Sequence, residues 1–346
     1  MISYSLAWGD TQMIEIAKGY FRSRVLCAAA RLGVADAMGG GAREVEAIAT
    51  ACGADAESLY RLLRALAAMG LTAETAPGSF ELTPMGEPLR KDVPGSVWPQ
   101  VIFWGDLIAD NWAYLTDCVR TGQTAPQVMA SENVQSRWSK EPSAQAIFRA
   151  VMGTAPVEDY LPLVRSWDFS RARVVADLGG GGGSLLCAVL ENYPHVRGML
   201  VDWPEAIEAA RPRFQATGLL DRCSLIGEDL TKRVPAGADV YVLKSVLHGY
   251  KDQGAVKLLK HCRAVIPHGG ALLVIEALLP DVVTKADESV EARIMSDLNM
   301  MAVTGGRERS AAEWKKLLGL AGFELARVIP AGVLSIMEGR AEAHPA

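Results

Sequence analysis

Residues 174–187 read VVADLGGGGGSLLC, and this stretch decides the fold of the 346-residue chain. A short β-branched run leads to Asp177, five glycines follow, and an apolar pattern typical of a helix begins at Leu185. Strand, glycine turn and helix in this order form the first βα unit of a nucleotide-binding sheet. Glycine suits such a turn because it takes positive φ angles without strain and lets the backbone approach a ligand closely.

The spacing of the glycines separates the classes of ligand. The dinucleotide fingerprint G-x-G-x-x-G/A fits no register of the run, and a phosphate loop would need a lysine that the run lacks. The pattern acidic-x-Gly-x-Gly-x-Gly does fit, with Asp177, Gly179, Gly181 and Gly183. It suits a ligand without phosphates that carries a cationic amino-acid end. S-adenosylmethionine is such a ligand, and a merely flexible turn is the alternative.

Length and composition narrow the possible functions. Half of the residues are apolar, which is enough for the cores of two domains. The net charge of −5 argues against a nucleic-acid partner, which would need a clustered positive field. The six cysteines are scattered without metal-ligand spacing, so we expect no metal site and reduced, mostly buried thiols in a cytoplasmic protein. No apolar run of membrane-spanning length is present, so no membrane partner is expected.

Residues 1–95 have the pattern of a helical domain. Apolar side chains cover more than one helical face over 11–33, which predicts either an oligomer interface or a central core helix. Two shorter helical patterns and a hairpin around Pro77-Gly78 follow, in the order of a winged-helix module. DNA binding would need a basic recognition surface, which the sequence lacks. We therefore expect a winged-helix-like dimerisation domain and a homodimer.

Residues 96–165 are rich in aromatic side chains and are expected to form a helical linker. The large side chains of this segment are suited to line a substrate pocket, and plain helix–helix packing is the alternative. The residues assigned to the pocket from this segment are Trp104, Phe148 and Met152.

Alternating strand and helix patterns over 166–346 predict an α/β fold, with a parallel sheet that has helices on both faces. The last two strand candidates, 323–329 and 333–338, are separated by only three residues. They must form an antiparallel hairpin, because parallel strands need a much longer crossover. A Rossmann-like sheet of seven strands with an antiparallel last strand is typical of methyltransferases rather than dehydrogenases. The other expected strands are 173–177, 197–201, 223–226, 239–244 and 271–276.

The polar residues at the carboxyl ends of the strands are the candidate site, because open α/β sheets bind ligands there. Asp202 ends the second strand, where its carboxylate can accept hydrogen bonds from both ribose hydroxyls, and a helix N-cap is the alternative. Asp229 follows the third strand and is placed to accept the adenine amino group, with Leu230 packing on the ring. Glu228 is the rival of Asp229 for this role.

His248 lies just beyond the end of the fourth strand, beside the expected position of a sulfonium methyl group. A phenol has a pKa of about 10, so at neutral pH a positioned base must take its proton during transfer. Glu276 ends the fifth strand and can hydrogen-bond the imidazole and favour its charged form, and Glu308 is a second such carboxylate. A lone histidine is more often structural, so the assignment depends on these two acids.

The helix expected before Glu308 carries Met295 and Asn299 on one face, four residues apart. Thioethers contact aromatic rings well and adapt to irregular shapes, so this face is expected to hold a flat substrate. Core filling is the rival interpretation.

Taken together, these stretches resemble the caffeate/hydroxyindole-type small-molecule O-methyltransferases of plants and bacteria, over nearly the whole chain. The resemblance implies a dimerisation domain, a helical linker and a class I methyltransferase domain. Besides the glycine motif, the matching stretches are Asp202-Trp203-Pro204, Gly227–Leu230, Lys244–His248, Val274-Ile275-Glu276, Gly305–Ser310, Glu313-Trp314 and Ala321-Gly322-Phe323. The resemblance implies that Asp202, Asp229 and Lys244 bind S-adenosylmethionine. It also implies that His248 is the base and that Glu276 and Glu308 flank it.

The residue after the histidine departs from the family's pattern. The family usually has Leu-His-Asp-Trp, whereas this chain has Leu247-His248-Gly249-Tyr250. The sequence predicts a homodimeric, S-adenosylmethionine-dependent O-methyltransferase that acts on a small aromatic natural product. A family member with a non-methylating or an N- or C-methylating reaction is the alternative, and a winged-helix regulator that senses S-adenosylmethionine is the alternative from another class.

Overall fold

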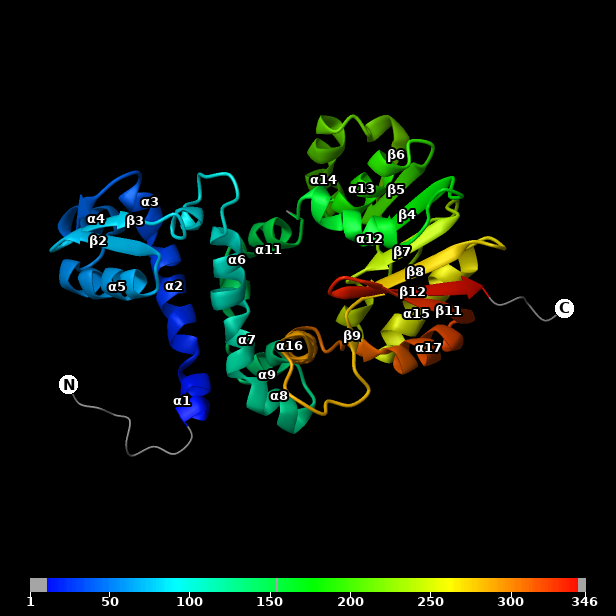
Figure 1. Ribbon diagram of the computed structural model, residues 1–346. Helices are drawn as coiled ribbons and strands as arrows, with labels where there is room; N and C mark the ends of the chain where they lie inside the picture. Colours follow the sequence, from blue (N-terminus) through cyan, green and yellow to red (C-terminus); the bar gives the residue numbers. More distant parts are fainter. Residues whose placement is uncertain (1–10, 154, 342–346) are drawn as a thin grey trace. The chain divides into compact units, whose positions relative to one another are not determined.

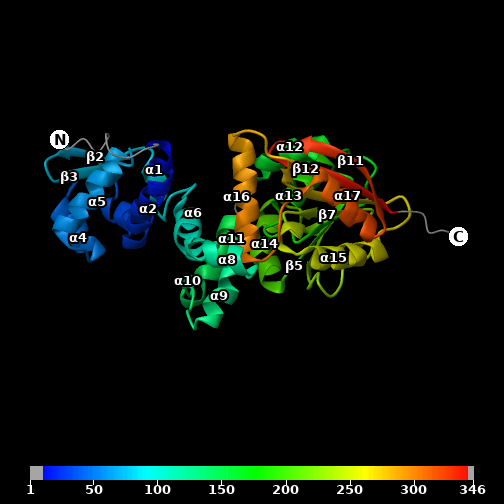
Figure 2. The same cartoon turned by 90° about the horizontal axis from the view of Figure 1, so that it is seen from below.

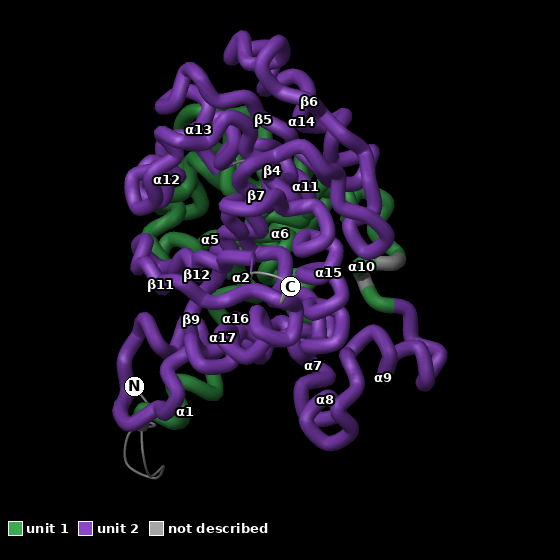
Figure 3. Tube along the Cα trace, turned by 90° about the vertical axis from the view of Figure 1, so that its right-hand side faces the viewer, with its two compact units in different colours: residues 1–110, 136–148 green, residues 111–135, 149–346 purple. Residues whose placement is uncertain are grey.

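A computed structural model describes residues 11–153 and 155–341 of the chain. The chain divides into two compact units, which Figure 3 colours separately. Unit 1 comprises residues 1–110 and 136–148, and unit 2 comprises 111–135 and 149–346. The segment 96–165, which was expected to link two domains, contributes to both units.

Unit 1 begins with helices and a small antiparallel sheet of order β1-β3-β2. The single helix expected over 11–33 is instead two helices, α1 and α2, which meet at Gly19, because glycine is the weakest helix former apart from proline. The expected order of helix, turn, helix and hairpin is present. The bounds are α1 Thr11–Lys18, α2 Tyr20–Leu32, α3 Val34–Met38, β1 Arg43–Glu44, α4 Val45–Cys52, α5 Ala56–Ala68, β2 Thr72–Ala76 and β3 Ser79–Leu82.

The core of this part of unit 1 follows from helical periodicity. Leu59, Leu63 and Leu66 recur on one face of α5 and are buried together with Ile48 of α4. Asp55 caps α5 by accepting a hydrogen bond from the backbone N–H of Ser58 at 2.8 Å. The later elements that contribute to unit 1 are η2 Glu87–Leu89, α6 Trp98–Ile102, η3 Phe103–Leu107, α10 Arg137–Lys140, and parts of α7 Ala109–Ala113 and α11 Ala144–Gly153.

Unit 2 is built on a seven-stranded sheet of order β11-β12-β8-β7-β4-β5-β6 (Figure 1). The strands β4 to β8 pair in parallel, and β12 pairs antiparallel with both β8 and β11. The predicted class of sheet and its antiparallel hairpin are therefore confirmed. The bounds are β4 Val174–Leu178, β5 Arg197–Asp202, β6 Cys223–Gly227, β7 Val240–Lys244, β8 Ala271–Glu276, β11 Phe323–Ala331 and β12 Leu334–Ala341.

Helices cover both faces of this sheet, and the period-2 alternation of the strands separates the two cores. In β8, Leu273 and Ile275 pack on one side, and Leu272 and Val274 pack on the other. The first core includes α12 (Leu161–Ser166), α13 (Ser184–Asn192) and α14 (Pro204–Ala216). The second core includes α15 (Asp252–Val265) and α17 (Ala311–Leu320). Figure 1 shows these two helices side by side, and Figure 2 shows the same elements from below.

The remaining elements of unit 2 are helices and short strands outside the seven-stranded sheet. Helix α16 (Glu288–Val303) packs against α8 (Leu115–Thr121) and α9 (Ala125–Ser131). The short strands β9 (Leu278–Leu279) and β10 (Arg309–Ser310) pair in parallel directly after the end of β8. The short helices are η4 Val157–Tyr160, η5 Leu220–Arg222 and η6 Leu247–Gly249.

Two expectations from composition can be compared with the fold. Five of the six cysteines are buried and Cys52 is half-buried, which confirms mostly buried thiols. Within the described part of the chain, no helix combines the length and the apolar character needed to cross a bilayer.

Candidate active site

The glycine turn between β4 and α13 takes the left-handed backbone that the sequence predicted. Gly179, Gly181 and Gly183 have φ values of +72°, +54° and +76°. A Cβ atom on Gly179 would lie 2.8 Å from Cγ2 of Val246, and one on Gly183 would lie 2.4 Å from Cε2 of Phe214. A Cβ atom on Gly181 would meet no atom of the described residues within 4 Å. The turn is therefore packed at two of these glycines and open at Gly181.

Asp177 lies buried beside this turn without a hydrogen-bond partner for either carboxylate oxygen among the described residues. Burial raises its pKa to about 7, the positive charge of Lys244 counteracts this, and the charge of Asp202 adds to it. A buried carboxylate without a partner is costly and is stabilised by a cationic group. The acid and the open turn thus fit a ligand with a cationic amino-acid end.

Asp202, at the end of β5, is directed to the glycine turn. Its Oδ2 accepts a hydrogen bond from the backbone N–H of Gly181 at 2.8 Å, and its Oδ1 accepts one from the N–H of Trp203 at 2.7 Å. Helix α14 begins after Trp203 and has no side-chain cap, so Asp202 does not fill the N-cap role that was its alternative. Burial raises the pKa of the Asp202 carboxyl.

The candidate adenine-binding residues follow β6. Asp229 accepts hydrogen bonds from the backbone N–H and hydroxyl of Thr231 at 3.0 and 2.7 Å, and these bonds lower its pKa. Its rival Glu228 forms an ion pair with Arg233. Leu230 is buried, and its Cδ1 lies 3.9 Å from the Cβ position of Gly179, so it borders the glycine turn.

Lys244 ends β7 beside the same turn. Its Nζ lies 3.4 Å from Oγ of Ser245 and 5.5 Å from the ring centroid of Tyr160. Ser245 has a φ of +54°, which is unusual for a residue other than glycine. Its backbone N–H donates to the carbonyl of Ile275 at 3.0 Å, so the chain turns sharply while it stays attached to β8. Strained backbone of this kind is concentrated at functional sites.

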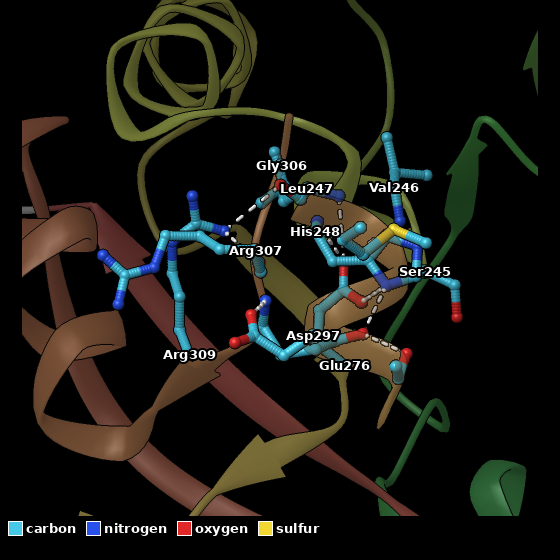
Figure 4. Close-up of polar contacts among 12 residues, drawn as sticks. Ser245, Val246, Leu247, His248, Glu276, Asp297, Gly306, Arg307 and Arg309 are labelled. Carbon is cyan, nitrogen blue, oxygen red and sulfur yellow. Dashed lines mark hydrogen bonds and ion pairs between the residues drawn. The ribbon is translucent and has the colours of Figure 1, made fainter. Parts of the chain in front are cut away.

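Two buried carboxylates, those of Glu276 and Glu308, face Nδ1 of His248. Figure 4 shows Glu276 beside the histidine. Its Nδ1 lies 2.9 Å from Oε1 of Glu308 and 3.5 Å from Oε2 of Glu276. Both glutamate side chains are 1% exposed, whereas the His248 side chain is 22% exposed. Carboxylates accept hydrogen bonds, so the neutral imidazole carries its proton on Nδ1 and leaves the lone pair on Nε2.

Glu276 also fixes the backbone of the loop that carries His248. Its Oε1 accepts hydrogen bonds from the N–H groups of Val246, Leu247 and His248 at 3.0, 2.9 and 3.3 Å (Figure 4). Burial raises the pKa of Glu276 to about 7, against the opposing effect of His248. One side chain at the end of β8 thus holds the loop and places a carboxylate beside the imidazole.

The surroundings of His248 favour its protonated form. Burial by itself lowers the pKa of the imidazole, but the hydrogen bond to Glu308 and the charges of Glu276 and Glu308 outweigh burial. The net result is a pKa above the usual histidine value. The arrangement can accept a proton on Nε2 and stabilise the imidazolium that results.

Two polar residues of α16 that sequence reasoning missed hold Glu308. The hydroxyl of Ser296 donates to Oε1 of Glu308 at 2.8 Å, and Oδ1 of Asp297 accepts from the backbone N–H of Glu308 at 2.8 Å. Ser296 lies three residues before Asn299, so helical spacing already placed it near the candidate face. Its direct contact with Glu308 had no separate sequence signal.

Arg309 is a third missed residue, and it braces the loop around His248. Its buried guanidinium donates to the carbonyls of Leu247 and Tyr250 at 3.2 and 2.8 Å. It also donates to the carbonyl of Arg307 at 3.2 Å and to Asp252 Oδ1 at 3.1 Å through Nε and 2.9 Å through Nη2. Nothing in the sequence distinguished Arg309 from the exposed Arg307 two residues earlier.

The loop 305–310 and the loop of His248 are in direct backbone contact. A Cβ atom on Gly306 would lie 2.0 Å from the carbonyl oxygen of His248, so only glycine fits there. The N–H of Arg307 donates to the same carbonyl at 2.8 Å. Because β10 also pairs with β9 just beyond Glu276, Glu308 is brought to the imidazole from 60 residues away in sequence.

The structure places the predicted substrate residues in both units. Met295 and Met152 are exposed in unit 2, and Asn299 is buried there. Trp104 and Phe148 belong to unit 1, where the rings of both lie against Phe103 with centroid distances of 4.8 and 5.9 Å. Unit 2 alone therefore brings together the candidate base and the residues of α16.

His248, Glu276 and Glu308 also satisfy the distance criterion for a metal site, with ligand atoms within 4.8 Å of one another. Oε1 of each glutamate is already an acceptor of two or three hydrogen bonds. Oε2 of both glutamates has no hydrogen-bond partner among the described residues. The hydrogen bonds at Oε1 and the contact with Nδ1 of His248 suit proton chemistry.

Two family models match the chain. A model described as an O-methyltransferase domain matches residues 112–324, and one described as an O-methyltransferase dimerisation domain matches residues 14–92. The chain is similar to phenazine O-methyltransferase PhzM of Lysobacter antibioticus, with 36% identity over 95% of each chain. It is 29% identical to phenazine-1-carboxylate N-methyltransferase of Pseudomonas aeruginosa over 92% of each chain.

A solved structure is similar over nearly the same span. It is NcsB1, an O-methyltransferase from neocarzinostatin biosynthesis, in complex with S-adenosyl-L-homocysteine and 1,4-dihydroxy-2-naphthoic acid. The identity is 34% and the TM-score 0.77, and the match covers 92% of this chain and 95% of that one.

Proposed function

This chain belongs to the family of S-adenosylmethionine-dependent O-methyltransferases, and we propose that it methylates a hydroxyl group of a small aromatic natural product. The observation that carries the proposal is the position of His248, whose Nδ1 faces two buried carboxylates and whose Nε2 has no hydrogen-bond partner among the described residues. Relatives that act on phenazines and a structural neighbour that holds a dihydroxynaphthoic acid support an aromatic acceptor.

The residues around the glycine turn are proposed to bind the cofactor, which supplies an electrophilic methyl group on a sulfonium. Asp177 supports this assignment, because its buried carboxylate needs a cationic partner, and Gly181 leaves room for a ligand. Asp202 at the end of β5 and Lys244 at the end of β7 add polar groups on the two sides of β4. The complete proposed set is Asp177, Gly179, Gly181, Asp202, Asp229, Leu230 and Lys244.

His248 is proposed to act as the general base. Nε2 of His248 would take the proton of the acceptor hydroxyl as its oxygen bonds to the methyl carbon and the bond from that carbon to the sulfonium sulfur breaks, so no free phenolate is required at neutral pH. Glu308 accepts the hydrogen bond from Nδ1, and the charge of Glu276 stabilises the imidazolium. Met295, Asn299 and Met152 are proposed to contact the acceptor, and Trp104 and Phe148 stay predictions from the sequence.

Transfer to nitrogen is the second candidate. It is favoured by the N-methyltransferase relative and by Gly249, which stands where the family usually has aspartate. A Cβ atom on Gly249 would meet nothing within 4 Å, so the departure removes a charge without relieving a clash. Incubation with labelled S-adenosylmethionine and a matched panel of phenols and aromatic amines decides between the candidates. We expect methylated phenols by mass spectrometry, and methylation of the amines alone would reverse the assignment.

Replacement of Asp202 by alanine is expected to weaken S-adenosylmethionine binding by about 10-fold to 100-fold. The change removes a carboxylate that can accept charge-assisted hydrogen bonds and that already holds the N–H of Gly181. Isothermal titration calorimetry measures the effect. Glu208→Ala is the control, because Glu208 is exposed on α14 and pairs with Arg211, and equal affinities of Asp202→Ala and the wild type would remove Asp202 from the site.

The protein is proposed to be a homodimer, with residues 1–95 as the dimerisation domain, 96–165 as the linker and 166–346 as the cofactor-binding domain. The support is an exposed apolar surface on α1 and α2, formed by Met13, Ile14, Ile16, Tyr20 and Phe21. Such patches on soluble proteins mark interaction surfaces.

Sedimentation at micromolar concentration is expected to give twice the chain mass of 37.1 kDa. Ile16→Asp combined with Phe21→Asp should yield a monomer, because two buried charges would be unpaired in the interface. Val119→Asp, at an exposed apolar position of unit 2, should leave the dimer intact. A monomeric wild type would refute the homodimer.

A further inference from the structure

Asn299 places a polar side chain on a face of α16 that also carries methionine. The residue is 8% exposed. The indole N–H of Trp112 donates to its Oδ1 at 3.0 Å. Tryptophan can only donate through this group, so the amide must turn Oδ1 toward Trp112 and Nδ2 the other way. The orientation of the amide is thus decided by chemistry.

The two hydrogens of Nδ2 are unused donors in the part of the chain that the structure describes. No described residue accepts a hydrogen bond from Nδ2, and the atom is not fully enclosed. Water can reach this atom, but a molecule bound beside it that offers no acceptor would exclude the water and leave the donor unsatisfied, at a cost in free energy. A molecule that offers an acceptor avoids this cost. The N–H groups therefore act as a directed donor toward whatever molecule lies beside α16.

The donor lies close to the base along the helix. Ser296 is three residues before Asn299, and neighbours at this spacing have Cβ atoms about 5–6 Å apart. The Ser296 hydroxyl donates to the same oxygen of Glu308 that lies 2.9 Å from Nδ1 of His248. Asn299 therefore lies one helical turn from a residue that contacts the partner of the candidate base.

We propose that Asn299 determines acceptor specificity and selects hydroxylated aromatic molecules that carry a second oxygen acceptor, a carboxylate or a ring carbonyl. Trp112 is the positioning residue that keeps the N–H groups of Asn299 pointed at this oxygen. The inference rests on the proposed function, because it takes an aromatic acceptor to bind beside His248. An apolar substituent in the same place would leave the buried N–H groups without a partner, and sites of this kind discriminate strongly.

Matched pairs of naphthols test the inference. The members of a pair differ only by a carboxylate or a methyl group, placed ortho to the hydroxyl, peri to it, or on the distal ring. Binding is measured by calorimetry in the presence of S-adenosylhomocysteine, and methyl transfer is measured separately as kcat/KM. For at least one pair, we expect the wild type to prefer the carboxylate by about 10-fold to 100-fold in both.

Three variants separate the roles of the residues. Asn299→Leu should abolish the preference, because the hydrogen bond to the carboxylate is lost. Methyl naphthols do not make this bond, so their affinity should stay within about 3-fold of that of the wild type. Asn299→Asp keeps the acceptor for Trp112 but repels a carboxylate, so it should invert the preference. This variant tests the inference even if the leucine variant fails to fold. Trp112→Phe frees the amide to rotate and should reduce the preference in part. Met295→Leu is the control, since it changes the apolar lining equally for both members of a pair.

The outcomes distinguish this inference from the proposed function. Equal binding of both members in every pair would overturn the inference, and so would a wild-type preference that persists in Asn299→Leu and Asn299→Asp. A binding preference that depends on Asn299, without methyl transfer to any naphthol, would support the inference and overturn O-methylation of such phenols.

Discussion

Replacement of His248 by asparagine is expected to lower turnover by about 10²–10⁴, the usual contribution of general base catalysis. Asparagine keeps the size and a hydrogen-bonding group but cannot take the acceptor's proton. Affinity for S-adenosylmethionine should stay within a few-fold, because Asp177, Gly181 and Asp202 lie around a different turn. Single-turnover methylation and calorimetry on the same variant measure the two quantities.

The pH dependence gives an independent measurement on the same residue. The base must be neutral, so the rate of the wild type should rise with pH through the pKa of His248. The two glutamates raise this pKa, so the rate should rise at a pH above the usual pKa of histidine. Glu308→Gln removes one of the negative charges, so the rise of the rate should move to lower pH. In His248→Asn this pH dependence should be absent.

Two results would contradict this role. Full activity of His248→Asn at neutral pH would mean that proximity alone drives transfer. If the wild type and the variant both bind the cofactor but neither methylates any acceptor, the departure at Gly249 marks a different reaction.

Replacement of Arg309 by methionine is expected to lower the free energy of unfolding by about 3–5 kcal/mol, because buried carbonyls that lose a donor cost about 1–3 kcal/mol each. The guanidinium donates to the carbonyls of Leu247, Tyr250 and Arg307. Methionine fills similar volume but donates nothing. Denaturant unfolding followed by fluorescence and circular dichroism measures the loss, together with turnover at a temperature where the variant is folded.

Arg307→Met is the matched control. Arg307 is exposed and its side chain pairs with Glu313, also at the surface, so its loss should change stability by no more than about 0.5 kcal/mol. If both variants were equally stable, the carbonyls would have found other donors and Arg309 would not brace the loop. A stable Arg309→Met with low turnover would mean that it positions His248 without stabilising the fold.

Local pattern was sufficient to predict the sheet. The strands that lead to Asp177, Asp202 and Lys244 are short apolar runs, and their placement required only the run and the glycine or polar residues that end it. The last hairpin followed from chain length alone, since three residues cannot connect parallel strands. The positive φ angles of the glycine turn were also predictable, because the ability to take positive φ without strain belongs to glycine itself.

The single sequence also located the groups at the strand ends, because an open parallel sheet brings these ends to one edge. That rule placed His248 and Glu276 near each other before any coordinates. It said nothing of which nitrogen of His248 meets which oxygen, nor that Glu276 holds three backbone N–H groups.

Only the tertiary structure decided how these groups are held. Arg309 contacts Leu247 across 62 residues, and Trp112 contacts Asn299 across 187. Neither residue differs in local pattern from exposed neighbours of the same type. Hydrogen bonds of buried side chains depend on distances that the whole fold sets, and periodicity describes only residues a few positions apart. For this physical reason the sequence determined the sheet and the chemistry at its edge, and the packed structure determined the orientation of the base and the direction of the Asn299 amide.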